Sequence, residues 1–513
     1  MRKAVSLLFV PSLIVSMLTG CGTNSVSPFP TPSPTAQTVP VSLTMTDDPP
    51  SGVSVLFFQV SLTAATLTSA SGSPVSLLNN NTPILVDVTQ LQALSAFLGS
   101  ADVPAGAYSS LSLTFANPKL VILNTSDQAI TSTCAIGSVC QLTPTLDNSA
   151  TVNLSGAPFP VTVSANSPLG FLIDFRLNTI IQPDLSVNLA AANGVTLSQV
   201  PPASPSQPPP FGVFTGTVQS VSASQNQFAV QTLAGQTFTI DTNSSTVLAD
   251  WPPCASPGGL SCLSAGTVVQ VQVASVVSAG TLLAAQVTWL QASGQQTVVG
   301  TVVGIHTSTT SPTNQTVLQL ILHATPTSDA NLPLGGEASV AIASGAAFSI
   351  DTNGFTISSG FVFNGITCLG VGQTVQVNVA SGSLTPPANP GPSSGWGPPP
   401  LLSFTTNDIQ LEPSQITGTV LYLGSGAFTL SILPDIFSGP PPPSALPLPE
   451  SIVETTAQTT FQGLSPDSFS GLALGDTVSV SGWVFPQNGI LDPAVGPPIV
   501  VAQAVALHPG GMF

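Results

Sequence analysis

Positive charge is what this chain of 513 residues has least of. It carries 4 Lys and Arg residues against 21 Asp and Glu residues, and only 5% of all residues are charged. Arg2 and Lys3 belong to the N-terminal segment, so Lys119 and Arg176 are the only basic residues after it. A chain so poor in cations cannot neutralise nucleic-acid phosphates or hold anionic lipid through a basic patch. We therefore expect no nucleic acid among its partners.

Long apolar stretches and catalytic motifs are also scarce. Beyond the N-terminal segment no stretch reaches about 18 continuous apolar residues, as a membrane-spanning helix would require. The phosphate-binding loop and the zinc-protease motif are absent from the sequence. We therefore predict a non-catalytic protein that uses no cofactor. A paired-carboxylate glycosidase stays open as an alternative, because its two acids can lie far apart in a sequence.

The N-terminus has the features of an export signal. Arg2 and Lys3 precede an apolar run from Ala4 to Val15, and Leu18-Thr19-Gly20-Cys21 follow it. The apolar run is shorter than the 20 or so residues of a spanning helix. The four residues that end in Cys21 resemble the lipobox of bacterial lipoproteins, in which the cysteine is acylated, for example with palmitate. The alternative is an ordinary cleaved signal peptide with an incidental cysteine.

This resemblance implies a location outside the cytoplasm, with the chain tethered through lipid on Cys21. Gly22, and not an aspartate, follows the cysteine. In lipoproteins of Gram-negative cells this resembles the outer-membrane default. We expect an extracytoplasmic protein that is lipid-anchored to the bacterial outer membrane, on its periplasmic side or at the cell surface. The membrane is therefore an expected partner.

The remaining cysteines predict local disulfide bonds. Six cysteines fit an oxidising compartment, and four of them form two pairs that are close in sequence. The two pairs are Cys134 with Cys140 and Cys254 with Cys262. Cys368 is left over. Zinc binding is the weaker alternative, because the spacings do not match zinc motifs and the three histidines are scattered.

Proline-rich stretches divide the chain, which is too long for a single hydrophobic core. We expect a signal peptide, a tether, a β domain, a linker and three further β segments. In that order, the expected bounds are 1–20, 21–40, 41–200, 201–211, 212–292, 297–412 and 415–508. The last two segments contain insertions rich in proline, 384–400 and 437–450, which we interpret as exposed loops.

Residues 41–200 have mostly the alternating pattern of β-strands. The stretch from Asp87 to Gly99 differs, because its apolar residues recur at helical spacing. Asp87 is a plausible N-cap and Gly99 a plausible residue just past the C-terminus. We therefore predict a short helix between them.

Three landmarks in this region carry a family resemblance. They are Thr46-Asp47-Asp48-Pro49-Pro50, Pro104-Ala105-Gly106-Ala107-Tyr108 and Ile173-Asp174-Phe175. Their kind and order resemble the domain-of-unknown-function family 4382. The resemblance implies a β-sandwich of the kind found in secreted or lipid-anchored proteins, and it implies no known activity.

The second half of the chain contains an internal repeat. Each of three copies opens with Gly-Thr-Val, continues to an apolar residue and an acid, and reaches a glycine followed by alternating valines. The opening glycines are Gly216, Gly300 and Gly418, and the acids are Asp241, Asp351 and Glu454. Each copy provides about five or six short strands, which suffice to close a small barrel.

The copies resemble a second family, domain-of-unknown-function family 5666, which occurs as tandem β domains in exported proteins. The sequence thus predicts an all-β fold, with an N-terminal β-sandwich followed by about three small β-barrel-like repeats. The repeat acids begin a pattern found in calcium loops, but no glutamate lies at the required distance. We interpret them as turn residues at strand ends.

Tryptophans and paired acids are the other candidate binding residues. Trp396 lies in the Gly/Pro-rich insertion and Trp251 lies beside a proline pair, so both are candidates for stacking on sugar rings. Asp47 and Asp48 are a candidate cation site if they lie in a loop, whereas neighbours in a strand point to opposite faces. Arg176 lies two residues after Asp174, and we predict a local ion pair between them.

These observations favour a non-catalytic, lipid-anchored cell-envelope protein, a structural or adhesive scaffold of tandem β domains. The alternative is a carbohydrate-binding surface lipoprotein that uses its loop tryptophans. Polysaccharide or another envelope protein would then be its partner in addition to the membrane.

Overall fold

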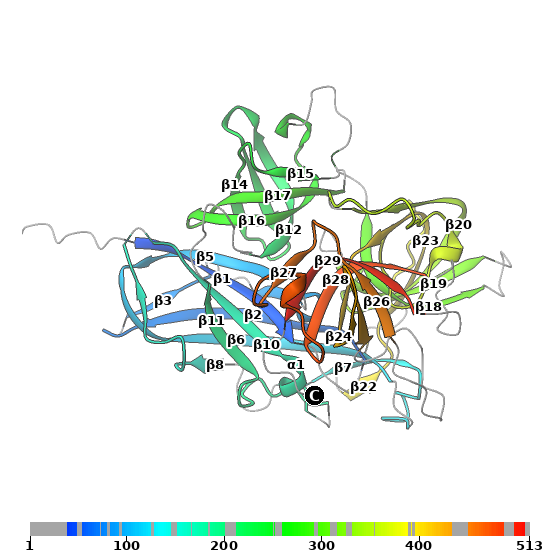
Figure 1. The fold of residues 1–513 in the computed structure, drawn as a ribbon, viewed down its shortest axis with the longest axis horizontal. Helices are drawn as coiled ribbons and strands as arrows, with labels where there is room; N and C mark the ends of the chain where they lie inside the picture. The colour runs from blue at the N-terminus through cyan, green and yellow to red at the C-terminus, as the bar shows by residue number, and fades with distance from the viewer. Residues whose placement is uncertain are drawn as a thin grey trace, which may run out of the picture. The chain divides into compact units, whose positions relative to one another are not determined.

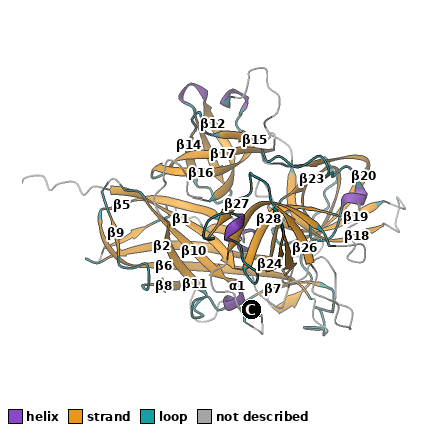
Figure 2. Cartoon of the chain, in the orientation of Figure 1, coloured by secondary structure: helices purple, strands orange, loops and turns teal. Residues whose placement is uncertain are grey.

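The protein is described by a computed structural model. It describes residues 38–507 except 49–53, 72, 79–82, 92–94, 125–127, 145–150, 166, 183–184, 201–211, 250, 252–258, 292–295, 308–314, 325–330, 353, 388–390, 392–394, 433–449 and 487–496. The regular secondary structure of the described residues is almost entirely β-strand, as Figure 2 shows. They contain no helix that is long and apolar enough to cross a bilayer. The predicted all-β fold is confirmed.

The N-terminal part of the fold is a β-sandwich (Figure 1). One of its sheets has the order β11 (Val195–Val200), β10 (Leu169–Arg176), β1 (Thr38–Asp48) and β5 (Ala96–Pro104). The second sheet contains β7 (Val139–Thr143), β6 (Gly106–Leu123), β2 (Ser54–Ser69) and β3 (Pro74–Ser76), with β4 (Ile84–Asp87), β8 (Thr151–Leu154) and β9 (Val161–Val163) at its sides. Inward-facing residues of both sheets form one continuous core, which includes Leu43, Leu62, Phe115 and Phe171. This is the expected sandwich.

The Pro-Ala-Gly-Ala-Tyr landmark forms the corner between β5 and β6. The Tyr108 hydroxyl donates a hydrogen bond to the carbonyl of Pro104 over 2.8 Å, and the ring of Tyr108 is buried in the sandwich core. The chain turns at Gly106, whose φ of 158° is positive and close to extended, a value that glycine adopts readily. The landmark is therefore a structural corner, in which a buried tyrosine satisfies a backbone carbonyl.

The predicted helix from Asp87 to Gly99 is wrong. Only one turn of 3₁₀-helix forms, η1 (Val88–Leu91), and β5 begins at Ala96. Gly99 pairs with Leu43 of β1 instead of ending a helix. Pairing with a distant strand has therefore outweighed the local helical spacing. The sandwich has one other short helix, α1 (Leu177–Ile180).

Three β units follow the sandwich (Figure 1). The first contains β12 (Val213–Ser222), β13 (Gln227–Thr232), β14 (Thr237–Asp241), β15 (Val247–Ala249), β16 (Val268–Ser278) and β17 (Thr281–Gln291), with η2 (Ala223–Gln225) and η3 (Leu260–Cys262). The second contains β18 (Thr297–Thr307), β19 (Thr316–Ala324), β20 (Glu337–Ile350), β21 (Thr374–Asn378) and β23 (Leu401–Glu412), with η4 (Ile366–Cys368). The third contains β24 (Ser414–Leu423), β25 (Ala427–Ile432), β26 (Glu450–Glu454), β27 (Thr460–Gln462), β28 (Thr477–Phe485) and β29 (Ile499–Leu507), with η5 (Phe469–Gly471). We call these units the first, second and third barrels.

All three barrels have the same strand order. In the second barrel β18, β19, β20, β23 and β21 close into a ring, with β20 and β23 parallel. The same ring of pairings links β12, β13, β14, β17 and β16 in the first barrel. It also links β24, β25, β26, β29 and β28 in the third. Numbered within one barrel the order is 1-2-3-5-4-1 with strands 3 and 5 parallel, which is the order of the OB-fold.

The two repeated glycines have separate structural reasons. A Cβ at Gly216 or Gly300, the first residue of the Gly-Thr-Val motif, would lie 2.6 Å from a carbonyl oxygen of the neighbouring strand. The second repeated glycine precedes the fourth strand and has a φ near 88° in each copy, for example at Gly372. That left-handed conformation strongly favours glycine. The sequence repeat therefore records one close strand contact and one tight turn.

Apolar side chains cross between neighbouring units. Phe97 of the sandwich belongs to the core of the first barrel, where its ring lies 5.6 Å from that of Phe238. Trp483 and Phe485 of β28 belong to the core of the second barrel. The Trp483 ring lies 5.2 Å from that of Phe355. Residues 38–513 accordingly form one compact unit, in which the barrels share core residues with their neighbours.

Candidate functional site

Several residues singled out from the sequence lie outside the described residues. These are the lipidation candidate Cys21 and the disulfide candidate Cys254. Asp47 and Asp48 lie at the end of β1, where they pair with Phe175 and Arg176 of β10. Their side chains are not among those described. In the described part of the chain no group of three or more His, Cys, Asp or Glu residues could hold a metal ion.

The first predicted disulfide is present. Cys134 and Cys140 are bonded and completely buried in the sandwich. Cys262 is also disulfide-bonded. Cys368 is a free and buried thiol. The bond between Cys134 and Cys140 is therefore a structural disulfide inside the sandwich.

Trp396 does not lie in an exposed loop. It is the middle residue of β22 (Gly395–Gly397), a strand that pairs with β7 of the sandwich, and its ring packs partly buried against the sandwich core. Its carbonyl accepts a hydrogen bond from the Thr133 hydroxyl over 3.0 Å. The interpretation of the whole insertion as a loop is therefore wrong at these residues. The edge of β7 offers backbone groups that the inserted segment satisfies.

The other acidic candidates have local protein partners. Asp174 and Arg176 form the predicted ion pair, with 3.4 Å between Oδ2 and Nε. Asp241 accepts a hydrogen bond from the Gln227 side chain over 2.8 Å. The carboxyl-bearing residue of the second repeat, Asp351, is 2% exposed. These contacts agree with structural roles at strand ends.

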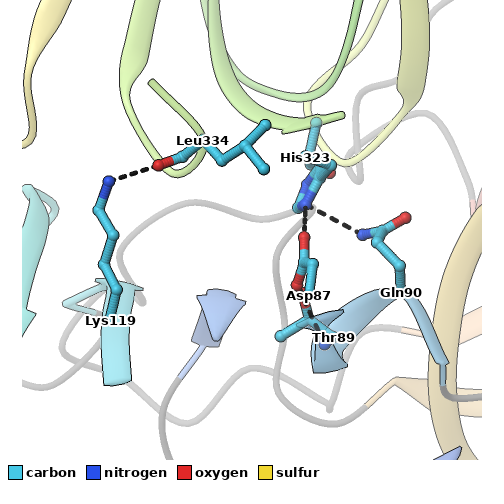
Figure 3. A network of polar contacts seen from close by, with 7 residues as sticks. Asp87, Thr89, Gln90, Lys119, His323 and Leu334 are labelled. Atoms are coloured by element: carbon cyan, nitrogen blue, oxygen red, sulfur yellow. Dashed lines mark hydrogen bonds and ion pairs between the residues drawn. The ribbon is translucent and has the colours of Figure 1, made fainter. Parts of the chain in front are cut away.

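A buried polar group joins the sandwich to the second barrel, and the sequence did not reveal it. His323 of β19 places its Nδ1 2.7 Å from Oδ2 of Asp87, at the end of β4. Its Nε2 lies 2.8 Å from the hydroxyl of Thr301 on β18. The side chains of His323 and Asp87 are only 2% and 9% exposed. Figure 3 shows the carboxylate of Asp87 pointing at the imidazole. We call Asp87, His323 and Thr301 the polar junction.

Residues of η1 complete the polar junction. The backbone N–H and the hydroxyl of Thr89 both donate to Oδ1 of Asp87, over 3.2 and 2.5 Å. The side-chain nitrogen of Gln90 lies 3.1 Å from Nδ1 of His323 (Figure 3). The predicted N-cap role of Asp87 is thus realised on a single turn, while its second oxygen is left for the histidine. Both carboxylate oxygens are therefore hydrogen-bonded, as a buried acid requires.

Lys119 lies at the same contact between sandwich and barrel. Its ammonium group donates a hydrogen bond to the carbonyl of Leu334 (Figure 3). The same group lies 5.8 Å from the centre of the Phe57 ring. Burial lowers the pKa of Lys119 to about 8, because desolvation disfavours its charged form. One of the two basic residues beyond the N-terminal segment is thus used inside a domain contact.

A separate apolar cluster lies beside these polar contacts. Phe57, Leu56, Val121 and Leu123 of the sandwich pack with Ile321 of the second barrel. Gly335, with a φ of 67°, lies under the Phe57 ring, and a Cβ there would meet that ring at 2.5 Å. The contact therefore combines shape, apolar burial and hydrogen bonds.

The polar junction has the connectivity of a nucleophilic triad, in the order carboxylate, imidazole, hydroxyl. Its accessibility differs from that of such a site. Thr301 is 9% exposed, and its strand is paired on both sides, so backbone N–H groups of β18 are engaged in sheet ladders. A small cavity of about 40 Å³, partly open to solvent, adjoins Thr301, His323 and Gln415. An acyl substrate needs both an approach to the hydroxyl and free donors for its oxyanion. The arrangement fits a structural hydrogen-bond chain better.

A weak sequence signal existed for this site. His323 stands alone in an apolar strand, a position that more often reflects a satisfied core histidine than a ligand. Asp87 was recognisable as a capping residue. Nothing local connects the two, because 236 positions separate them.

The fold and these contacts define an all-β protein in which a sandwich is joined to three OB-like barrels. Comparison with known families agrees with this class. Residues 38–193 match the model of a domain of unknown function (DUF4382). Residues 215–288, the first barrel, match the model of a second domain of unknown function (DUF5666). The resemblance of the N-terminal region to the first family is confirmed, and the resemblance of the repeat to the second family is confirmed for its first copy. No curated protein matches the chain.

Proposed function

We propose that this protein is a non-catalytic, lipid-anchored component of the bacterial cell envelope, which acts as a structural or adhesive scaffold. The observation that carries the proposal is the buried contact between the sandwich and the second barrel. Asp87 and His323 meet there with little exposure, and the apolar cluster that contains Phe57 lies beside them. Such a contact favours one fixed arrangement of the two units, because separating them would expose the apolar cluster to water and break the hydrogen bond between Asp87 and His323.

The other contacts between units support the same proposal. Phe97 joins the sandwich to the first barrel, and Trp483 joins the third barrel to the second. The side-chain amide of Gln373 donates to the carbonyl of Val484 over 2.9 Å, which adds a buried polar contact between the second and third barrels. A protein that transmits or resists force at a cell surface benefits from units that do not hinge.

Attachment to the membrane rests on the lipobox resemblance at Cys21. The lipid would tether the chain at one point, and the tether at 21–40 would separate the described unit from the bilayer. The proposed role therefore requires two separate properties, which are attachment of the chain to lipid and a fixed arrangement of its β units.

The test uses the bacterium that encodes the chain. We would compare a deletion strain with strains that produce the parent, Cys21→Ser and Phe57→Ala, and score adhesion and detergent sensitivity. Cys21→Ser, which removes the lipidation site, and Phe57→Ala, which weakens the contact between the sandwich and the second barrel, are both expected to behave like the deletion. Phe428→Ala, which truncates a buried ring of the third barrel alone, is the matched control for general destabilisation. Unaltered adhesion and integrity in the deletion strain would refute the proposal.

Thr301→Val separates a scaffold from an enzyme. The substitution keeps the shape of the side chain and removes the hydroxyl that a triad would use as nucleophile. A scaffold is expected to keep its phenotype when the amount of folded protein is matched by immunoblot. Loss of the phenotype with an intact fold would favour catalysis at the polar junction.

A further inference from the structure

The first barrel carries a pair of tryptophans whose described ring contact and hydrogen bond lie within that barrel. Trp289 lies on β17, and Trp251 lies two residues beyond β15. The two strands pair in parallel, with Ala249 opposite Thr288, so the two indoles come together. Their ring centres are 5.6 Å apart and their planes meet at 68°. Both rings are partly buried and pack against the core of the first barrel.

The indole nitrogens of the pair differ in their partners. Nε1–H of Trp251 donates to the carbonyl of Val287 over 3.2 Å, which fixes the orientation of that ring. Among the described residues, Nε1 of Trp289 has no hydrogen-bond acceptor. It is also not one of the fully buried polar atoms that lack a partner. Nε1 of Trp289 is therefore not completely enclosed. The pair thus combines two oriented, partly buried indole rings with one N–H donor that has no partner among the described residues.

The charge around the pair restricts the ligand. Residues 212–292 contain only Asp241 and Asp250 as charged residues, and they contain no Lys, Arg or His. An anionic ligand would find no cation there to balance its charge. A neutral sugar fits better, because its apolar ring face can lie against an indole while a hydroxyl accepts from the free N–H.

We propose that Trp251 and Trp289 form a binding site for a neutral oligosaccharide. The site lies at β17, the fifth strand of the ring, and at the segment that follows β15. OB-folds commonly bind ligands on the face of their second and third strands, which here are β13 and β14. The site goes beyond the scaffold role and does not depend on it. It keeps one of the loop tryptophans expected from the sequence, Trp251, and adds Trp289.

The experiment is a glycan-array screen of the full chain purified in detergent, followed by titration of the strongest neutral glycan with tryptophan fluorescence. Trp289→Phe keeps an aromatic ring in the core and removes the N–H. We expect it to weaken binding about ten-fold or more, as loss of a central contact does. Trp251→Phe is expected to weaken binding as well, because the ring loses its fixed orientation.

Trp396→Phe is the matched control, since it alters a partly buried tryptophan of the sandwich and is expected to leave affinity unchanged. Thermal unfolding of each variant confirms that the first barrel is folded. The absence of neutral-glycan binding would overturn the proposal, and so would binding that both first-barrel variants retain. A preference for acidic glycans would also overturn it. Normal envelope phenotypes in the Trp289→Phe strain, with glycan binding lost, would leave the scaffold proposal intact.

Discussion

Removing the ammonium group of Lys119 gives the sharpest test of the contact between sandwich and barrel. Burial lowers the pKa of Lys119 from 10.5 to about 8. Each unit of difference between folded and unfolded states corresponds to about 1.4 kcal/mol. The full difference would be about 3 kcal/mol, and partial exposure of the side chain reduces it to about 2 kcal/mol.

The direction of the pH effect on the free energy of unfolding follows from which state, folded or unfolded, binds the proton of Lys119. Between pH 8 and 10.5 the unfolded chain holds the proton of Lys119 and the folded chain has largely released it. The free energy of unfolding therefore rises with pH across this window on account of Lys119. Below pH 8 the buried charge is a constant cost to the folded state.

Lys119→Met removes both the charge and the hydrogen bond to Leu334. The lost hydrogen bond costs about 1 kcal/mol, so at pH 7 we expect the variant to be about 1 kcal/mol more stable than the parent. This advantage is expected to disappear as the pH approaches 10. Urea unfolding at several pH values from 7 to 10 measures it, as the difference between the two chains.

The difference between the chains cancels the titration of other groups. Tyr108 is one of these, because burial raises its pKa in both chains. Arg176→Met is the control for losing one positive charge at a partly exposed position, and its difference from the parent is expected not to follow pH. A parent-minus-Lys119→Met difference that is constant from pH 7 to 10 would refute the argument.

Three further predictions concern the fold. Tyr108→Phe removes the hydrogen bond that closes the sandwich corner and is expected to lower the free energy of unfolding by about 1 kcal/mol, whereas an unchanged urea midpoint would contradict this role. Trp483→Ala empties a fully buried site shared by two barrels, so we expect a loss of about 3–5 kcal/mol and, in limited proteolysis, cleavage of the second and third barrels together; cleavage of the third alone would argue against a shared core. Gly300→Ala forces a Cβ against a neighbouring carbonyl and is expected to destabilise the second barrel, while Gly156→Ala, which meets nothing within 4 Å, is expected to be neutral; equal effects on thermal unfolding would contradict the close-contact explanation.

The repeat was predictable because its signals are local. A strand alternates inward-facing and outward-facing residues, and a glycine marks a turn or a close contact. The strands of each copy can therefore be predicted from that copy alone. Gly300 and Gly372 illustrate this, since each has a geometric reason within its own barrel. The Cys134–Cys140 bond was predictable for the same reason, because its partners are six positions apart.

The errors arose where distant segments meet. The stretch ending at Gly99 has helical spacing, yet its last residues belong to a strand because β1 offers a partner. Trp396 lies among glycines and prolines, yet it is a strand residue because the edge of β7 accepts it. In both cases backbone hydrogen bonds formed with a distant segment outweigh the local preference.

The sequence by itself determined the all-β character, the sandwich, the threefold repeat and the scarcity of cations. These properties follow from composition and from patterns within a few residues. Only the tertiary structure decided that Asp87 meets His323, that Lys119 is buried beside Phe57, and that Trp251 meets Trp289. Such meetings depend on how separate strands pair and how finished units pack, and no local pattern encodes the distance between two residues far apart in the chain.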